Sequence, residues 1–468
     1  MTYENGAKPF LYLPIEVKAR EYKSKLLFSC IAAREGFNIV LGNRKRLQAL
    51  LSDLPRGIFI EKGLESPGKA RAISSYIKKG HKVVAWDEEG LFFITGDIYK
   101  KNRVNIKAFE MLEVFFAWGD EQKRFILEKL EAHNLDESIV KVTGNPRVDI
   151  INTEFKRVFA RDSRVLREKY GPFILINSNF TIVNPFIGKE QLKKNLEEWG
   201  YLETEEGKNK FAEIEANILD IYKHFIEMLP LLSTNFNDHK IIVRPHPAES
   251  HESWQEAASK LSNVMVINDG DNVLPWIMAA DALIHNRCTT GIESYLLGKI
   301  SIAYCPIKAR EFVDNLPNQL STKVHSLDEL VAVLQRIING EAPLKSEESM
   351  MQQGVAKYIY NVNGSLASEL IIEELKKIDI SPQRFSMTSY YFKRYLRIIL
   401  QPAKRLVKKL LTGQAGSYVN ESYIKHKFQD LTEGEIKADI AELAAVDPSL
   451  KSINVKALGD QCFYLSGN

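Results

Sequence analysis

Three consecutive acids, Asp87, Glu88 and Glu89, stand where the apolar run VVAW ends, and a glycine follows them. A carboxylate held beside a substrate can take a proton from a hydroxyl group, and like charges next to it raise its pKa toward a useful range. The triplet is therefore a candidate general base. Taken alone, it is more simply explained as an acidic turn in which water solvates all three groups.

A second stretch, IIVRPHPAES at 241–250, combines residue types suited to a phosphate group. The β-branched residues predict a strand that ends at Arg244, and prolines on both sides of His246 fix the backbone. We expect His246, with Pro247 beside it, to lie at the entrance of a helix formed by ESWQEAASKL, where free N–H groups also attract anions. The alternative is a proline-stiffened turn with an exposed histidine.

The stretch ALIHNRCTTGIESYLLGK at 282–299 predicts a second phosphate contact. Thr289 or Thr290 is placed to cap a helix, and Gly291 permits close approach of a ligand. Glu293 lies in the first turn, where it could bind ribose hydroxyls or simply favour the helix dipole. An ordinary N-cap without any ligand explains the threonines equally well.

The elements that must position these residues follow a regular order. Short apolar runs such as FLYLPI and FNIVLG alternate with helical patterns in the first third, and a second such series begins at FILINSNF. This alternation predicts βαβ units, parallel sheets and ligand sites at the carboxyl ends of strands. We predict an α/β fold with two Rossmann-like domains facing across a cleft, at 1–155 and 156–375, and a helical C-terminal extension at 376–468.

Composition narrows the class of protein. The chain has 468 residues, of which 45% are hydrophobic and 26% charged, so we expect a soluble globular protein. A formal net charge of +3 does not indicate nucleic-acid binding. The four cysteines are far apart and favour a reducing cytoplasm, and neither an export signal nor a membrane span is expected.

Residues 384–413 differ from the rest of the chain in their charge. Aromatic and aliphatic side chains are interspersed there with Lys and Arg, and no acid occurs. The pattern predicts a basic amphipathic helix suited to an anionic membrane surface. A helix packed against the protein, with its cations in water, is the alternative.

The order of RPHPAE and ALIHNRCTTGIESYLLGK, together with VTGNPRVD at the domain junction, resembles the donor half of GT-B glycosyltransferases over roughly residues 10–370. Within that fold the chain is similar to bacterial surface-carbohydrate and capsule enzymes, including those that use CMP-activated ulosonic acids such as Kdo and sialic-acid-like sugars. Bacterial sialyltransferases of this fold have an acid-acid-glycine motif that supplies the base and an HP motif whose histidine contacts the CMP phosphate. EEG at 88–90 and HP at 246–247 match these motifs in that order.

The resemblance implies that Glu88 is the base, although Asp87 or Glu89 could hold that role because the acidic run is longer than the motif. It also implies that the departing phosphate is neutralised by His246 and that neither a metal nor a cofactor beyond the CMP-sugar donor is needed. NDGDN at 268–272 lacks the context of a metal-binding DxD motif. The other donor-binding candidates are Arg244, Pro247, Thr289, Thr290, Gly291 and Glu293 around the nucleotide, and Arg287, Asn177, Ser178 and Asn179 for the donor carboxylate.

The expected activity is transfer of a CMP-activated ulosonic acid to a hydroxyl of a bacterial surface glycan, including lipid-linked glycans, at the cytoplasmic face of the inner membrane. Three alternatives remain open: a CDP-glycerol or CDP-ribitol type phosphotransferase, an enzyme like UDP-GlcNAc 2-epimerase, and a non-catalytic membrane-associated scaffold. The sequence leaves the sugar, the acceptor, the linkage and the stereochemical outcome open.

Overall fold

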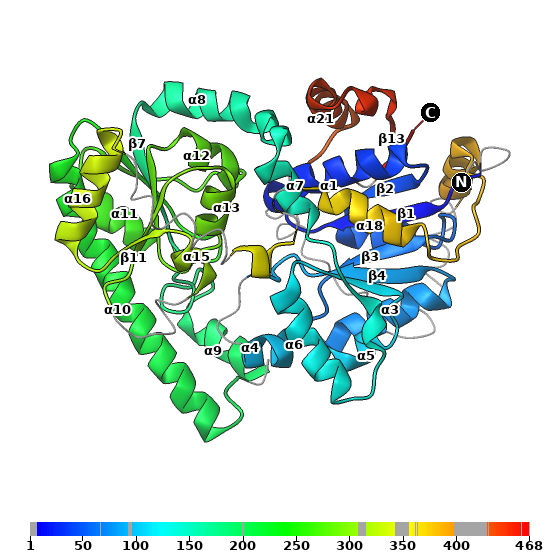
Figure 1. Ribbon diagram of the computed structural model, residues 1–468, viewed down its shortest axis with the longest axis horizontal. Coiled ribbons are helices and arrows are strands. Elements are labelled where there is room, and N and C mark those ends of the chain that lie inside the picture. The colour runs from blue at the N-terminus through cyan, green and yellow to red at the C-terminus, as the bar shows by residue number, and fades with distance from the viewer. Residues whose placement is uncertain are drawn as a thin grey trace. The chain divides into compact units, whose positions relative to one another are not determined.

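The computed structural model describes residues 7–65, 67–91, 96–198, 201–307, 315–341, 355–360, 362, 364–396, 428, 430–459 and 461–467. The chain forms two compact units (Figure 1). Unit 1 combines residues 1–158 with 358–468, and unit 2 contains residues 159–357.

The sheet of unit 1 is mostly parallel. Its strands lie in the order β13-β14-β2-β1-β3-β4-β5-β6 among the described residues, and only β13 and β14 run antiparallel to their neighbours. Strand order reverses between β1 and β3, which makes this the point where α/β sheets bind ligands. The strands are β1 (Phe10–Ile15), β2 (Asn38–Asn43), β3 (Ile58–Lys62), β4 (Lys82–Trp86), β5 (Val114–Ala117), β6 (Val140–Val142), β13 (Asn454–Gly459) and β14 (Cys462–Ser466).

Helices cover both faces of this sheet because its strands are apolar on both sides. Every residue of β1 is buried, and alternate side chains such as Phe10 and Tyr12 pack into one core cluster with Phe59 and Tyr76. On the opposite face α1 packs against α7 and α18. The helices of unit 1 are α1 (Lys18–Arg34), α2 (Arg44–Leu50), α3 (Pro67–Lys78), α4 (Gly96–Arg103), α5 (Ile106–Phe109), α6 (Asp120–Glu131), α7 (Pro146–Asn152), α18 (Ala367–Leu375) and α21 (Glu433–Val446), with 3₁₀ turns at Glu137–Ile139 and Pro448–Ser452.

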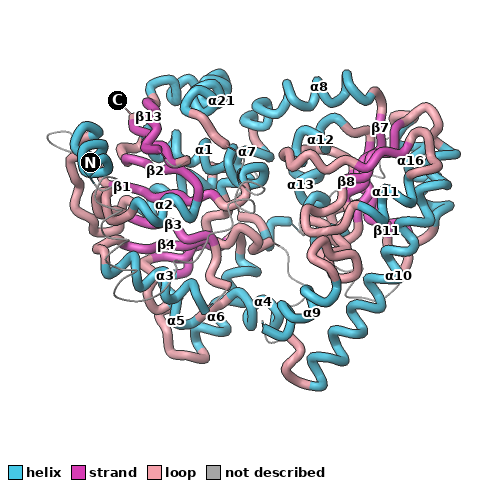
Figure 2. Tube along the Cα trace, turned by 180° about the vertical axis from the view of Figure 1, so that it is seen from behind, coloured by secondary structure: helices cyan, strands magenta, loops and turns pink. Residues whose placement is uncertain are grey.

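Unit 2 has a parallel six-stranded sheet in the order β12-β11-β10-β7-β8-β9 within its described part. Numbered from β7, this is the Rossmann order, and the reversal falls between β7 and β10. Figure 2 shows its strands as a sheet of their own with helices on both sides. The strands are β7 (Phe173–Asn177), β8 (Lys240–Arg244), β9 (Val264–Val266), β10 (Ala282–His285), β11 (Ser301–Tyr304) and β12 (Thr322–Val324).

The helices of unit 2 fall into two groups. Side chains of α10, α11 and α16 join β7 and β8 in one hydrophobic core cluster, whereas α12 packs against α8 and α13. The helices are α8 (Ala160–Tyr170), α9 (Lys189–Glu198), α10 (Glu205–Asn235), α11 (Glu252–Ala258), α12 (Val273–Ala279), α13 (Thr290–Leu296), α15 (Leu316–Gln319) and α16 (Leu327–Ile338), and a 3₁₀ segment, Glu154–Phe159, precedes α8.

The predicted fold class, an α/β architecture of two Rossmann-like domains with helices in the C-terminal part, is confirmed by the two strand orders and by α21. The predicted domain boundaries at 155 and 375 stay predictions, while the compact units divide at 158 and 357.

The β13–β14 hairpin is the element that the sequence analysis did not anticipate. Strand β14 pairs with β2, and Gly42 faces Cys462 in that pairing. A Cβ atom at Gly42 would lie 2.4 Å from the carbonyl oxygen of Gln461, so this edge accepts the hairpin only with glycine there.

The basic segment at 384–413 is described in part. Residues 387–396 are helical, and residues 397–413 lie outside the described part of the chain. None of the helices that the structure describes is both long and apolar enough to cross a membrane.

Candidate active site

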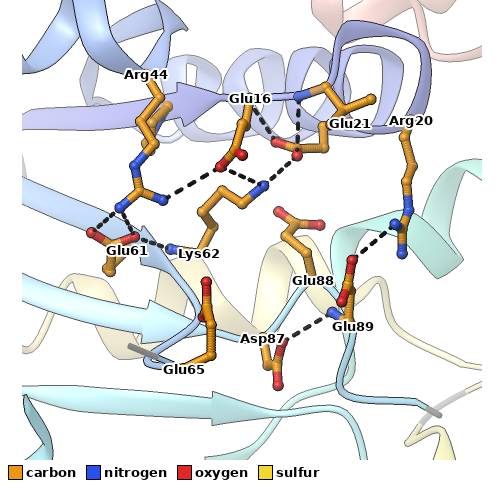
Figure 3. A network of polar contacts seen from close by, with 12 residues as sticks. Glu16, Arg20, Glu21, Arg44, Glu61, Lys62, Glu65, Asp87, Glu88 and Glu89 are labelled. Atoms are coloured by element: carbon orange, nitrogen blue, oxygen red, sulfur yellow. Dashed lines mark hydrogen bonds and ion pairs between the residues drawn. The ribbon is translucent and has the colours of Figure 1, made fainter. Parts of the chain in front are cut away.

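The carboxyl ends of β1, β3 and β4 in unit 1 carry a network of charged side chains (Figure 3). Burying isolated charges would cost several kcal/mol each, so every buried member needs a partner of opposite charge. Here Glu61, which is fully buried, pairs with Arg44 at 2.7 Å and with Lys69 at 2.9 Å. The acidic triplet enters this network directly after β4.

Asp87 is held by Arg103, the last residue of α4. The guanidinium Nε lies 2.9 Å from Oδ2 and Nη2 lies 2.5 Å from Oδ1, and the N–H of Glu89 donates to Oδ1 at 3.0 Å. Burial raises the pKa of Asp87, but the Arg103 guanidinium and the hydrogen bonds outweigh this effect and hold the pKa below its ordinary value. Asp87 is therefore an ionised group that fixes the loop.

Glu88 occupies a different environment, in which both contacts fall on one oxygen. Its Oε1 lies 2.9 Å from Nζ of Lys25 on α1 and accepts a hydrogen bond of 2.8 Å from the indole N–H of Trp86. Oε2 contacts none of the described residues, and 9% of the surface of Glu88 is exposed to solvent. Glu88 thus combines a fixed oxygen with one that can meet a substrate.

Glu89 is the exposed member of the triplet, with 55% of its side chain accessible. It pairs with Arg20 at 3.0 Å and with Arg103 at 3.5 Å. Arg103 thus serves both Asp87 and Glu89, Lys25 pairs with Glu88 and Arg20 pairs with Glu89, and these cations offset the mutual repulsion of the three acids. Of the three, Glu88 is the acid with a carboxylate oxygen that contacts none of the described residues.

In unit 2, the last residues of β8, β7 and β10 form a row at the switch point. Arg244 and His285 are the register partners of Asn177 on its two sides, so the three side chains share one face of the sheet. Asn177 and His285 are buried, and neither atom of the Asn177 amide nor Nδ1 of His285 has a hydrogen-bond partner among the described residues. Such groups in an apolar interior cost free energy unless a ligand or water pairs with them. The sequence analysis identified Arg244 and Asn177 but missed His285, whose position at a strand end was the available signal.

The sequence suggested that Arg244 contacts a phosphate, but other residues of unit 2 already hold its guanidinium group. Its Nη2 donates to Oδ1 of Asp269 at 2.6 Å and to the carbonyl of Asp271 at 3.2 Å, and the guanidinium stacks 4.7 Å from the ring centroid of Trp276. The NDGDN loop therefore holds Arg244. Its Nε is buried and has no partner within the described part of the chain, so one donor is left for a ligand.

His246 lies in the exposed turn after β8, because α11 begins only at Glu252 with His251 as its N-cap. The expectation that His246 stands at the helix entrance is wrong, since the prolines form a separate turn before the helix. The backbone N–H of Ala248 donates to Nδ1 of His246 at 3.2 Å. This bond places the proton of a neutral ring on Nε2, where it can donate to a phosphate oxygen.

Glu249 is the functional candidate that the sequence analysis missed in this loop. Its Oε1 accepts from the hydroxyl of Ser178 at 2.8 Å and from the backbone N–H groups of Phe180 and His246 at 2.9 and 3.2 Å. Its Oε2 accepts from the indole of Trp254 at 3.1 Å. Burial raises the pKa of Glu249. Its carboxyl group links the loop after β7 to the HP turn through these hydrogen bonds.

These contacts also settle the places of the nearby candidates. Ser178 is turned toward Glu249, whereas Asn179 and Pro247 are exposed. The only sequence signal for Glu249 was its place in RPHPAE, which by itself does not distinguish a buried acid from a solvated one.

The loop between β10 and α13 has a constrained backbone. Arg287 adopts φ 52°, which is uncommon for a residue with a side chain, and its N–H donates to Oδ1 of Asn318 at 2.9 Å. Thr289 is the N-cap of α13, but its side chain makes no capping hydrogen bond. Gly291 is required because a Cβ atom there would lie 2.4 Å from Nε2 of His285. Thr290 and Glu293 are buried beside it.

No protein-family model and no curated protein sequence matches the chain. Among solved structures, it is similar to the UDP-GlcNAc 2-epimerase of Methanocaldococcus jannaschii, with 15% identity, 79% of this chain and 99% of the other covered, and a TM-score of 0.47. A putative UDP-N-acetylglucosamine 2-epimerase of Listeria monocytogenes gives 12% identity, coverage of 81% and 100%, and a TM-score of 0.49. The wall teichoic acid polymerase TagF gives 12% identity, coverage of 80% and 90%, and a TM-score of 0.45. At this similarity the neighbours do not assign an activity, which must come from the residues of this chain.

Proposed function

We propose that this protein is a GT-B type glycosyltransferase that transfers a CMP-activated ulosonic acid to a hydroxyl of a surface glycan. The observation that carries the proposal is Glu88, whose Oε1 is fixed by Lys25 and Trp86 while Oε2 has no contact among the described residues. A general base needs this combination, because it must be oriented and must still reach the proton that it takes.

In the proposed reaction, the acceptor oxygen forms a bond to the anomeric carbon and the bond from that carbon to the CMP phosphate oxygen breaks. The acceptor proton passes to Oε2 of Glu88, and CMP leaves with the bonding electrons. In this proposal His246, whose Nδ1 accepts from the backbone N–H of Ala248, donates from Nε2 to the departing phosphate. No metal is required, because the leaving group is neutralised by side chains.

The row Arg244–Asn177–His285 supports a donor site in unit 2. It stands at the switch point of a Rossmann sheet and contains buried polar atoms that lack a partner among the described residues. Burial lowers the pKa of His285 to about 3, so its imidazole is neutral and Nδ1 or Nε2 must act as an acceptor.

The proposal is tested by calorimetric titration of CMP, CDP, UMP and UDP with EDTA present, using the wild type and His246→Ala. Selective binding of CMP that His246→Ala weakens would support the donor assignment. A preference for CDP or UDP would instead favour the phosphotransferase or the epimerase activity. With CMP-sugars as donors, Glu88→Gln should lower turnover by at least about 100-fold, whereas a scaffold would show no turnover in either form.

We further propose that the enzyme binds an anionic membrane surface. In the helix at 387–396, Tyr391, Phe392 and Tyr395 are 46%, 62% and 62% exposed, and Leu396 is 42% exposed. Exposed aromatic residues that adjoin a basic segment are typical of helices that lie in a membrane interface. The expected location is therefore the inner face of the bacterial inner membrane.

A further inference from the structure

Lys25 is a lysine in the interior of unit 1, although lysine is rarely buried without a reason. It lies in the middle of α1 and its side chain is only 2% exposed. The sequence around it, SKLLFSC, gives no sign of a functional residue. Its ammonium group nevertheless reaches the loop that carries Glu88.

Three oxygen atoms surround the Lys25 ammonium group. They are the carbonyl oxygen of Pro14 in β1 at 2.7 Å, Oε2 of Glu21 at 2.8 Å and Oε1 of Glu88 at 2.9 Å. The ammonium group donates hydrogen bonds to the first two and forms an ion pair with Glu88. Lys25 therefore has a fixed position beside the candidate base.

The position of Lys25 does not depend on Glu88. Glu21, its second partner, accepts from the backbone N–H groups of Glu16 and Val17 at 3.1 and 3.3 Å and pairs with Lys62 of β3 at 2.6 Å. The strand carbonyl and this anchored carboxylate hold the ammonium group in place. Lys25 is thus the anchor, and Glu88 is the group that it orients.

We propose that Lys25 is a positioning residue for Glu88, which fixes Oε1 and thereby presents Oε2 to the acceptor hydroxyl. The proposal rests on the proposed function only in taking Glu88 as the base. The geometric support is the ion pair of 2.9 Å between the anchored ammonium group and Oε1.

The chain offers a matched control. Lys69 is also a buried lysine of this network, with 9% of its side chain exposed, but it pairs with Glu61 and not with Glu88. Replacing either lysine by methionine removes one buried charge and keeps much of the side-chain volume. Only Lys25→Met removes a charge from the candidate base.

The direct test is the fluorescence emission of Trp86, whose indole N–H donates to Glu88. The signal of Trp86 is isolated by subtracting the spectrum of Trp86→Phe. We expect Lys25→Met to shift this emission, because the carboxylate that contacts the indole loses its anchor, and Lys69→Met to leave it in place. In a Glu88→Gln background the shift should be absent, and an equal emission of the Lys25→Met and Lys69→Met variants would overturn the proposal.

Turnover provides the second measurement. In Lys25→Met, kcat should fall about 10- to 100-fold with little change in KM. In a Glu88→Gln background, Lys25→Met should have no further effect on rate, whereas a merely structural role would lower the rate in both backgrounds.

Lys25→Arg keeps the charge and serves if the methionine variant does not fold. It should lower kcat through misplacement of Glu88 and leave KM almost unchanged. A wild-type kcat in this variant would also contradict the proposal. Because the fluorescence measurement needs no substrate, it tests Lys25 even if the proposed donor is wrong, and turnover of Glu88→Gln tests the proposed function separately.

Discussion

Replacing Arg103 by methionine should destabilise unit 1 strongly, because it leaves the buried Asp87 carboxylate without its cation. The side chains of Asp87 and Arg103 are 3% and 21% exposed, and two N–H groups of the guanidinium contact the two carboxylate oxygens. Removing one partner of a buried ion pair costs about 3–5 kcal/mol. For a domain of this size, about 3 kcal/mol lowers the melting temperature by about 6 °C.

The assay is thermal and urea denaturation of the wild type beside Arg103→Met and Arg157→Met. Arg157 also pairs with an acid of unit 1, Glu154, but 72% and 65% of the two side chains are exposed. Water screens an exposed pair, so Arg157→Met should change the free energy of unfolding by no more than about 1 kcal/mol. If both variants lost the same stability, the inference that burial makes the Asp87 pair important would be refuted.

The same pair predicts a pH dependence. The pKa of Asp87 in the folded protein lies below its ordinary value. The stabilisation that the ionised Asp87 gives is therefore fully present above the pKa of the unfolded chain, about 3.9. It is lost as the pH falls through the pKa of the folded protein. The stability difference between wild type and Arg103→Met should therefore be largest near neutral pH and shrink below about pH 4. A difference that stayed constant down to low pH would mean that Arg103 acts through packing.

Three further predictions concern other sites. Glu249→Gln places an amide among four hydrogen-bond donors, so it should cost about 1–3 kcal/mol in urea denaturation and weaken CMP binding in calorimetry. Burial raises the pKa of Asp149 to about 6, so stability should fall as the pH rises from about 4 to 6, and Asp149→Asn should remove that part of the slope. Serine at both Phe392 and Tyr395 should weaken cosedimentation with phosphatidylserine vesicles at least about tenfold, with phosphatidylcholine vesicles as the control.

Much of the fold could be predicted from the sequence because buried parallel strands are apolar runs separated by amphipathic helices. The run FLYLPI predicted β1 with its observed ends, Phe10 and Ile15, and the strand before Arg244 ends where the analysis placed it. The β13–β14 hairpin could not be predicted, because its pairing with β2 depends on contacts between segments hundreds of residues apart. Nothing local in NVKALG or CFYLS specifies that partner.

Only the residue types of the candidate site and their places at strand ends could be predicted from the sequence. The resemblance favoured Glu88 and the HP turn, but the residues themselves gave no means of choosing among three adjacent acids. That choice depends on which cation each acid meets, and Lys25 and Arg103 come from different helices. For the same reason Arg244 looked like a free phosphate ligand, although Asp269 and Trp276 already hold it.

The discontinuous make-up of unit 1 has a consequence for the order of folding during protein synthesis. Unit 2 is one continuous segment, and all its described strands are synthesised before residue 358 is made. Unit 1 lacks α18, α21 and the strand that covers the edge of β2 until the last part of the chain emerges. An uncovered edge strand can pair with other chains, so the nascent protein should depend on chaperones longest at its first-made third. A stalled or truncated chain that ends near residue 358 should accordingly contain a folded unit 2 and an aggregation-prone N-terminal sheet.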